Sequence, residues 1–355
     1  EVRNRVFMAP LTRGRSGATR VPNDDNVKYY ADRATYAGLV FTEATTISES
    51  ANGWSGSAGL YTAEQMEGWK RVVDAVHSKG GKIVFQAWHM GRAAHSSFLD
   101  GNQIVAPSAV IIDGSHFGAE DGMYTADGSK QPFEEPRALE VEEIAAIVED
   151  YKASAVLAKE AGFDGVEVHS ANGYLIDTFL QSSTNQRTDE YGGSVENRMR
   201  FLNEVLDAVL TVWDADRVGI RISPNGVYND MGSEDNIETF TYVLEQLAPR
   251  GLAFVHAMDG LGFGFQQKCA ALTLEAMKGV YQGKLIGDVG YTRDSAEAAI
   301  DAGHATAITF GRPFIGNPDL PYRFAFDLPL EESDMSKWIV GDADGYNTYP
   351  FAEAE

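Results

Sequence analysis

The stretch GVEVHSANGY, residues 165–174, joins a short apolar run to a group of polar side chains at its end. The run lacks the regular apolar–polar alternation of a half-exposed strand, which is typical of strands that are covered on both faces. It ends at His169, and Asn172 and Tyr174 follow closely. We interpret it as a buried strand that brings polar groups to one end of a parallel sheet.

Seven further β-branched apolar runs are found along the chain, at residues 6–10, 39–45, 82–88, 218–223, 253–258, 285–289 and 307–310. Helical patterns lie between the runs, at residues 24–38, 62–80, 142–162, 194–213, 236–251, 272–281, 292–303 and 317–326. One of them opens with Thr62 and Gln65 at capping-box spacing. Eight strands that alternate with helices predict an α/β fold, either a closed (β/α)₈ TIM barrel or a doubly wound sheet.

The chain is longer than the ~250 residues that such a barrel typically needs. The surplus lies mainly in residues 89–138, which follow the third strand and are rich in Gly, Ser, Asp and Pro. A connection of this length is uncommon unless it is functional. We therefore expect one domain over residues 1–355, with 89–138 as a lid over the catalytic face.

The charge balance bears on possible partners. The chain carries 29 basic and 52 acidic residues, a formal net charge of −23. This disfavours nucleic acid and anionic membrane surfaces as partners. The single cysteine, Cys269, excludes an intramolecular disulfide and a multi-cysteine zinc site, and no apolar run reaches the ~18 residues of a membrane span. We expect a cytoplasmic protein, monomeric or homodimeric, that acts on small molecules.

In a barrel of this kind the active site lies at the carboxyl ends of the strands. His169 and Asn172 both offer N–H donors there, which suits a carbonyl or nitro oxygen that gains negative charge. Tyr174 has a phenol that stays protonated at neutral pH and is suited to act as an acid. The alternative is that His169 is a satisfied core histidine and that Tyr174 packs in a helix.

Other strand ends also carry polar or glycine-rich groups. Hydroxyl, amide and guanidinium groups there suit the rim of a flat heterocycle, and the segments GDVGYT and FGRPF after strands seven and eight suit a phosphate. Ordinary loop polarity is the alternative. The residues are Pro10, Leu11, Thr12, Gln86, Trp88, Arg221 and Arg312.

Competing motifs are absent from the sequence. It contains no P-loop, no dinucleotide-binding G-x-G-x-x-G between a strand and a helix, and no H-E-x-x-H. Glu43, Glu167 and Asp288 are conceivable carboxylate partners for a metal beside His169, but we expect Glu167 to point away from it. We predict no metal site.

Five segments, namely MAPLTR, QAWHMGR, EVHSANGYLIDTFLQSSTNQRTDEYGGSVENR, RISPNGVYNDM and FGRPFIGNPDL, resemble the Old Yellow Enzyme family of FMN-dependent ene-reductases. They occur in family order over nearly the whole chain. Thr12 and Asn172 resemble the classical branch of the family. The resemblance implies a (β/α)₈ barrel that holds FMN non-covalently and uses NADPH or NADH as hydride donor.

The resemblance also implies roles for individual residues. His169 and Asn172 match the pair that binds the activating oxygen of the substrate, and Tyr174 matches the proton donor. Positions that match flavin contacts are Pro10, Leu11, Thr12, Ala44, Gln86, Arg221, Val289, Gly290, Gly311 and Arg312. Positions that match the substrate pocket are Trp88, Tyr228 and Ile339.

The implied reaction is a two-step exchange in one pocket. NAD(P)H reduces the flavin, leaves, and is replaced by an enone, enal, maleimide or nitroalkene, which receives the hydride and then a proton. Reduction of nitrate esters or nitroaromatics at the same flavin is the alternative. The sequence departs from the family pattern at Ala44, Asp288, Val289 and Ile339, so a bulkier or more acidic flavin environment and a different substrate range are expected.

Overall fold

The computed structural model describes residues 1–115, 119, 122–260 and 264–352. Its main sheet is a closed parallel barrel in the order β2-β1-β13-β12-β11-β10-β9-β4, with β3 continuing along β4. Closure is provided by β2, which pairs with both β1 and β4. A doubly wound sheet would have two free edges, so the barrel prediction is confirmed.

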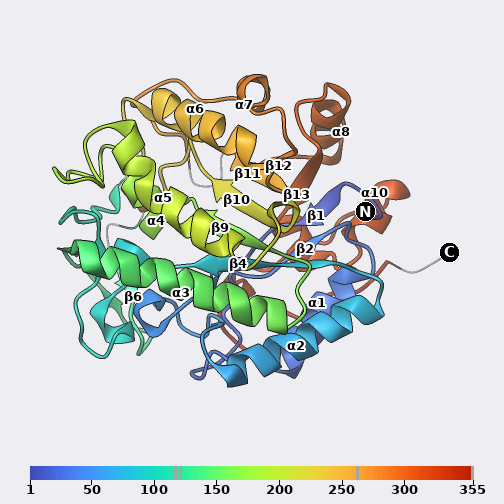
Figure 1. Cartoon of the computed structure of the whole chain (residues 1–355). Helices are drawn as coiled ribbons and strands as arrows, with labels where there is room; N and C mark the ends of the chain where they lie inside the picture. Colours follow the sequence, from blue (N-terminus) through green and yellow to red (C-terminus); the bar gives the residue numbers. More distant parts are fainter. Residues whose placement is uncertain (116–118, 120–121, 261–263, 353–355) are drawn as a thin grey trace.

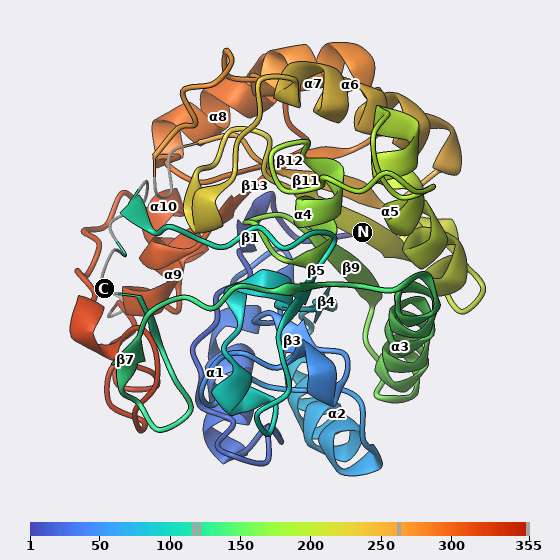
Figure 2. The same ribbon diagram turned by 90° about the vertical axis from the view of Figure 1, so that its left-hand side faces the viewer.

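Helices lie around the strands of the barrel, as Figures 1 and 2 show together. The strands of the main sheet are β1 (Val6–Met8), β2 (Val40–Phe41), β3 (Thr45–Thr46), β4 (Ile83–Trp88), β9 (Gly165–Ser170), β10 (Val218–Ile222), β11 (Phe254–Met258), β12 (Leu285–Asp288) and β13 (Ala307–Phe310). The α-helices are α1 (Asp24–Ala34), α2 (Ala63–Ser78), α3 (Val141–Glu160), α4 (Leu175–Leu180), α5 (Val195–Leu210), α6 (Asn236–Leu247), α7 (Leu274–Val280), α8 (Arg293–Asp301), α9 (Arg312–Gly316) and α10 (Leu320–Ala325).

Burial on both faces explains why the strand sequences read as apolar without alternation. Every residue of β4 and β9 is buried, because the barrel interior covers one face and helices cover the other. The predicted capping box of α2 is present: Thr62 accepts from the N–H of Gln65, whose side chain accepts from the N–H of Thr62. Capping thus fixes the start of a helix that packs on the barrel.

The second predicted strand differs from the observed one, because it is divided into β2 and β3. Between them the backbone N–H of Glu43 donates to the hydroxyl of Tyr30 at 2.8 Å, and the hydroxyl of Thr45 donates to the carbonyl of Glu43 at 2.7 Å. Side-chain hydrogen bonds therefore replace the strand ladder at this point.

The insertion of residues 89–138 crosses the barrel in Figure 2. It contains β5 (Val105–Ala106), β6 (Met123–Tyr124), β7 (Lys130–Gln131) and β8 (Arg137–Ala138), while 116–118 and 120–121 lie outside the described residues. Ile104 and Ile112 of the insertion share a buried cluster with Trp88 and Tyr174. The insertion is thus packed against residues at, or shortly after, the carboxyl ends of β4 and β9.

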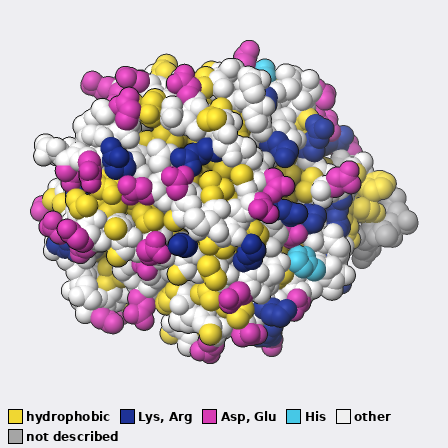
Figure 3. Space-filling view, viewed as in Figure 1, with side chains coloured by type: hydrophobic (Ala, Val, Ile, Leu, Met, Phe, Trp, Pro, Cys, Tyr) yellow, Lys and Arg dark blue, Asp and Glu magenta, His cyan; other side chains and the backbone are white. Residues whose placement is uncertain are grey.

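The surface reflects the composition. Asp and Glu side chains are spread over the face seen in Figure 3, with Lys and Arg side chains among them. None of the helices in the described part of the chain is long and apolar enough to cross a membrane.

Candidate active site

His169 lies near the end of β9 and is buried. Its Nδ1 faces the backbone N–H of Ala171 at 3.3 Å, so it acts as the acceptor and the ring proton of the neutral form is on Nε2. Burial, and next the charge of Arg221, lower the pKa of His169 well below its ordinary value. The imidazole is therefore a neutral donor through Nε2 at physiological pH.

Asn172 and Gly173 form a turn after β9, and both have left-handed backbones with φ of 60° and 71°. The N–H of Asn172 donates to Ser223 Oγ at 2.7 Å, and its carbonyl accepts from Asn229 Nδ2 at 2.8 Å. A Cβ on Gly173 would lie 2.7 Å from the Cβ of Asn229, so only glycine fits there. The turn is therefore held through the backbone atoms of Asn172 and not through its side-chain amide.

Tyr174 follows this turn and is 8% exposed. Its ring meets the His169 ring edge-on, with centroids 5.0 Å apart at 87°, and meets Trp88 at 5.0 Å and 82°. Burial, and next the hydroxyl of Tyr228, raise the pKa of Tyr174 well above 10. The structure thus brings His169, Trp88 and Tyr228 together around the phenol of Tyr174, which stays protonated.

Gln86 and Arg221 lie inside the barrel on β4 and β10, and both are buried. Gln86 donates through Nε2 to Glu167 at 2.7 Å, and Arg221 is ion-paired with Asp288. The Nε of Arg221 is buried and has no hydrogen-bond partner among the described residues. A buried donor without a partner is unfavourable, so this atom fits an acceptor supplied by a bound group such as the pyrimidine edge of FMN.

The loop after β1 carries Pro10, Leu11 and Thr12 and lies beside the loop after β13. The N–H of Ala9 donates to the carbonyl of Phe310 at 3.1 Å. A Cβ on Gly311 would lie 3.2 Å from Leu11, which places these two candidates in contact distance. The first and last strands of the barrel therefore bring their predicted flavin residues to the same side.

The remaining candidates are less enclosed. Val289 and Gly290 have left-handed backbones with φ of 74° and 84°, and the guanidinium of Arg312 lies 5.1 Å from the centre of the Trp338 ring. Ile339 is 42% exposed and is not part of the buried cluster around Trp88, which does contain Ala44. The structure does not bring Ile339 against Tyr174, and its role stays a prediction.

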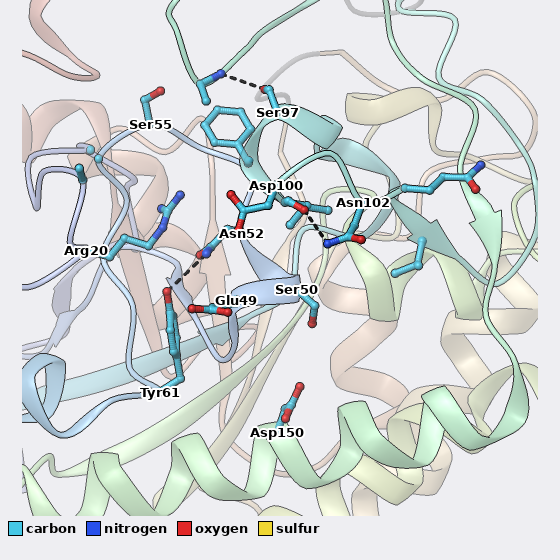
Figure 4. A pocket seen from close by; sticks show the side chains of 18 of the residues that line it. Arg20, Glu49, Ser50, Asn52, Ser55, Tyr61, Ser97, Asp100, Asn102 and Asp150 are labelled. Carbon is cyan, nitrogen blue, oxygen red and sulfur yellow. Dashed lines mark hydrogen bonds between the residues drawn. The ribbon is translucent and has the colours of Figure 1, made fainter.

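A cavity of about 1160 Å³ lies outside this group, among residues 49–61, the insertion and α3. None of the described residues that line it is a predicted site residue. Figure 4 shows carboxylates of Glu49, Asp100 and Asp150 around it, with Arg20 at one side. Burial of these carboxylates under a flat, largely apolar ring would be unfavourable.

Two supports of the site escaped sequence reasoning. Asp177 on α4 accepts from the N–H of Gly173 at 2.8 Å, and Arg92 donates to the carbonyl of Asn229 at 2.6 Å. Both groups act on backbone atoms, which leave no pattern in the sequence. The position of Asp177, four residues after a glycine turn, is the only available signal.

The expectation that Glu167 points away from His169 is wrong. Residues two apart on a strand share a face, and Glu167 binds Gln86 and His256 inside the barrel. Within the described residues, no group of three or more His, Cys, Asp or Glu side chains is arranged to hold a metal ion.

Comparison with known proteins identifies the family. The chain matches the model of the NADH:flavin oxidoreductase / NADH oxidase family over residues 1–331. It is 44% identical over 351 residues to a probable flavin mononucleotide-dependent alkene reductase of Leishmania infantum, covering 99% of this chain and 94% of the relative. It is 40% identical over 356 residues to 12-oxophytodienoate reductase 1 of Oryza sativa subsp. japonica, covering 99% and 90%.

Solved structures agree with these relatives. The old yellow enzyme homologue from Zymomonas mobilis matches with a TM-score of 0.92 at 41% identity, covering 98% of this chain and 96% of that one. Morphinone reductase in complex with tetrahydroNAD matches with a TM-score of 0.90 at 43% identity, covering 99% and 94%. The chain therefore belongs to the Old Yellow Enzyme family of NADH:flavin oxidoreductases and is an FMN-dependent ene-reductase.

Proposed function

We propose that this enzyme reduces the activated C=C bond of α,β-unsaturated carbonyl or nitro compounds, with NADPH or NADH as the source of hydride. The observation that supports this proposal most strongly is the edge-to-face pair of a neutral His169 and a protonated Tyr174 at the carboxyl end of β9. Relatives named as reductases of alkenes, 12-oxophytodienoate and morphinone are consistent with it.

In this proposal the protein holds FMN through Gln86 and Arg221 at the pyrimidine side, through the β1 loop along the ring, and through Val289, Gly290, Gly311 and Arg312 at the phosphate. When bound, FMN would supply the two-electron chemistry by which hydride passes from the nicotinamide to the β-carbon of the alkene. The insertion of residues 89–138 covers the pocket and excludes water.

The side chains of this chain then act on the substrate. His169 Nε2–H and the amide of Asn172 donate to its oxygen, which becomes negatively charged as the β-carbon is reduced. Tyr174 transfers its hydroxyl proton to the α-carbon. Trp88 fixes the position of the Tyr174 ring from one side, and Tyr228 hydrogen-bonds its hydroxyl.

The deciding experiment compares Tyr174→Phe with Tyr151→Phe in turnover of cyclohexenone and of a nitrate ester. Tyr151 is a matched control, because it is buried and its hydroxyl has no hydrogen-bond partner among the described residues. Loss of general acid catalysis is expected to slow enone turnover ~10²–10⁴-fold in Tyr174→Phe only. Unchanged enone turnover would refute the proton-donor role, and selective turnover of the nitrate ester by the native enzyme would favour the alternative substrate class.

Phenol binding gives a second, independent readout. The anion of p-hydroxybenzaldehyde presents one oxygen to both donors, and stacking on the flavin is expected to produce a long-wavelength absorption band. His169→Ala should weaken this binding, whereas the exposed His77→Ala should not. Equal affinities in all three proteins would remove the proposed role of His169 in oxygen binding.

A further inference from the structure

Four ionisable side chains meet inside the barrel beneath the predicted flavin contacts. We call Glu167, Arg221, His256 and Asp288 the interior cluster; they lie on the successive strands β9, β10, β11 and β12. Their side chains are 0%, 7%, 0% and 4% exposed. Charges so far from water interact with one another much more strongly than surface pairs do.

The hydrogen bonds of His256 define its charge. Nδ1 lies 2.8 Å from Glu167 Oε2, and Nε2 lies 2.9 Å from Thr309 Oγ1. The hydroxyl of Thr309 also lies 3.1 Å from the carbonyl of Gly287, to which it can donate while it accepts from the imidazole. With Glu167 Oε2 as the acceptor at Nδ1, both ring nitrogens then donate, which is the pattern of an imidazolium.

The electrostatics of the buried groups agree with this assignment. Burial alone would lower the pKa of His256, but Glu167 and Asp288 raise it above its ordinary value. Burial alone would raise the pKa of Asp288, but Arg221 and His256 hold it well below its usual range. The interior cluster thus contains two cations and two anions and is balanced only when Asp288 is charged.

The two carboxylates of the cluster bind both residues that are predicted to contact the pyrimidine, Gln86 and Arg221. Glu167 accepts from Gln86 Nε2 at 2.7 Å, Asp288 is ion-paired with Arg221 through Nη2, and His256 lies between the two carboxylates. The Nε of Arg221, which has no partner within the described residues, remains for a ligand. A flavin bound beside Arg221 would therefore meet a positive charge that Asp288 partly offsets.

We infer that Asp288 offsets the positive charge of Arg221 and so lowers the redox potential of the flavin bound beside it. Two-electron reduction places additional negative charge on the pyrimidine side of the flavin, and an unopposed guanidinium would favour that state. A carboxylate in contact with the guanidinium weakens the preference. The inference rests on the proposed placement of Arg221 beside FMN.

The test substitutes Asp288→Asn in the FMN-loaded enzyme. The asparagine oxygen can still accept from Arg221, so position is retained while the charge is removed. We expect affinity for reduced FMN to rise about tenfold relative to oxidised FMN, equivalent to a potential higher by ~30 mV for a two-electron couple. The readouts are the midpoint potential by dye-coupled titration and the dissociation constant of oxidised FMN.

The potential is measured at pH 6, because loss of the Asp288 charge also removes one of the groups that keep His256 protonated. Arg221, Glu167 and Asp288 are the charged groups that face this imidazole. Asp288→Ser removes the same charge with a smaller side chain and supplies a second measurement. An unchanged or lower potential in both variants at pH 6 would overturn the inference.

Asp319→Asn is the matched control. Asp319 forms a buried ion pair with Arg323 at 2.8 Å, with side chains 1% and 4% exposed, beside α10 and outside the predicted site. Its loss should reduce stability and leave the potential unchanged, and an equal shift in this variant would also overturn the inference. Arg221→Met separates the two proposals. If FMN affinity is unaffected in this variant, the placement of Arg221 beside FMN fails. If FMN binding is weaker but the potential of the Asp288 variants does not shift, only the role of Asp288 is contradicted.

Discussion

Asp177→Asn is expected to displace the turn of Asn172 and Gly173, and with it the proposed proton donor Tyr174, while FMN stays bound. Asp177 is fully buried and accepts from the N–H of Gly173 at 2.8 Å, from Gln181 Nε2 at 2.9 Å and from Ser223 Oγ at 3.3 Å. Three donors thus converge on one carboxylate. Asparagine offers one acceptor oxygen and an NH₂ group. Because all three partners of this side chain are donors, the NH₂ group must face a donor in place of an acceptor.

The size of the effect follows from these contacts. If the new oxygen keeps Gln181, the buried N–H of Gly173 loses a charge-assisted hydrogen bond, which reduces stability by about 1.5–3 kcal/mol. The turn then moves together with Asn172 and Tyr174. Displacement of reacting groups by ~1 Å can slow a reaction ~10²-fold. We therefore expect enone reduction to slow about 100-fold.

The assay follows reoxidation of the reduced enzyme by cyclohexenone in a stopped-flow instrument, with the absorbance of bound FMN recorded for each protein. Thr178→Val is the matched control, because Thr178 is fully buried in the same helix and its hydroxyl bonds only the carbonyl of Leu175 among the described contacts. A rate for Asp177→Asn within threefold of the native rate would refute the reasoning, as would an equal loss in Thr178→Val.

The pH profile offers a second check of the same contact. Burial raises the pKa of Asp177 to about 6, despite the hydrogen bonds that oppose the shift. Below that pH the carboxyl is protonated and loses an acceptor, so enone reduction by the native enzyme should fall as pH decreases through about 6. The inflection should be absent in Asp177→Asn. The pKa of Asp259 is also about 6, but Asp259 titrates in both proteins and so cannot cause a difference between them.

Three further outcomes are expected. Val289→Gly should stabilise the protein by about 1 kcal/mol in urea unfolding. A left-handed residue other than glycine costs about 1–2 kcal/mol, and the greater chain entropy of unfolded glycine offsets about 0.5–1 kcal/mol of the gain. No gain in stability would show that Val289 is not strained. Burial raises the pKa of Glu43 to about 7, so the folded state binds more protons and stability should fall as pH rises from about 4.5 to 7. Glu43→Gln should flatten that decline in melting temperature. Arg92→Lys loses one of the two hydrogen bonds that join Val110 to Asn229, and about 1.5–3 kcal/mol of stability should be lost; an unaltered urea midpoint would contradict this.

Sequence reasoning recovered the barrel because its strands are buried on both faces. Such strands read as unbroken apolar runs. Together with the helical patterns between them, they were compatible with a closed barrel or a doubly wound sheet, and the observed strand pairing selects the closed barrel. The division of the second strand was not recoverable. It depends on the hydroxyl of Tyr30 in α1, which competes with the ladder for the N–H of Glu43.

The candidate site was partly recoverable for the same reason. His169, Gln86 and Arg221 lie at or near strand ends, where a parallel barrel places its chemistry. Asp177 binds a backbone N–H four residues before it, and Arg92 binds a carbonyl far away in the sequence. Apart from the spacing of Asp177 from its glycine turn, no pattern in the sequence marks them. The direction of Glu167 was within reach, because residues two apart on a strand point to the same side, and the error lay in the application of that rule.

The overall charge of −23 does not determine the chemistry at the barrel mouth. Exposed charges act through water and salt, which screen them over ~10 Å, whereas His169 is buried near Arg221 and the imidazolium of His256, and both charges lower its pKa after burial does. The same two cations are balanced by Glu167 and Asp288 inside the barrel. The proposed donor to the substrate oxygen is thus neutral because burial and these two cations act together on His169, and the proposed flavin contact Arg221 is moderated by carboxylates of the same four adjacent strands.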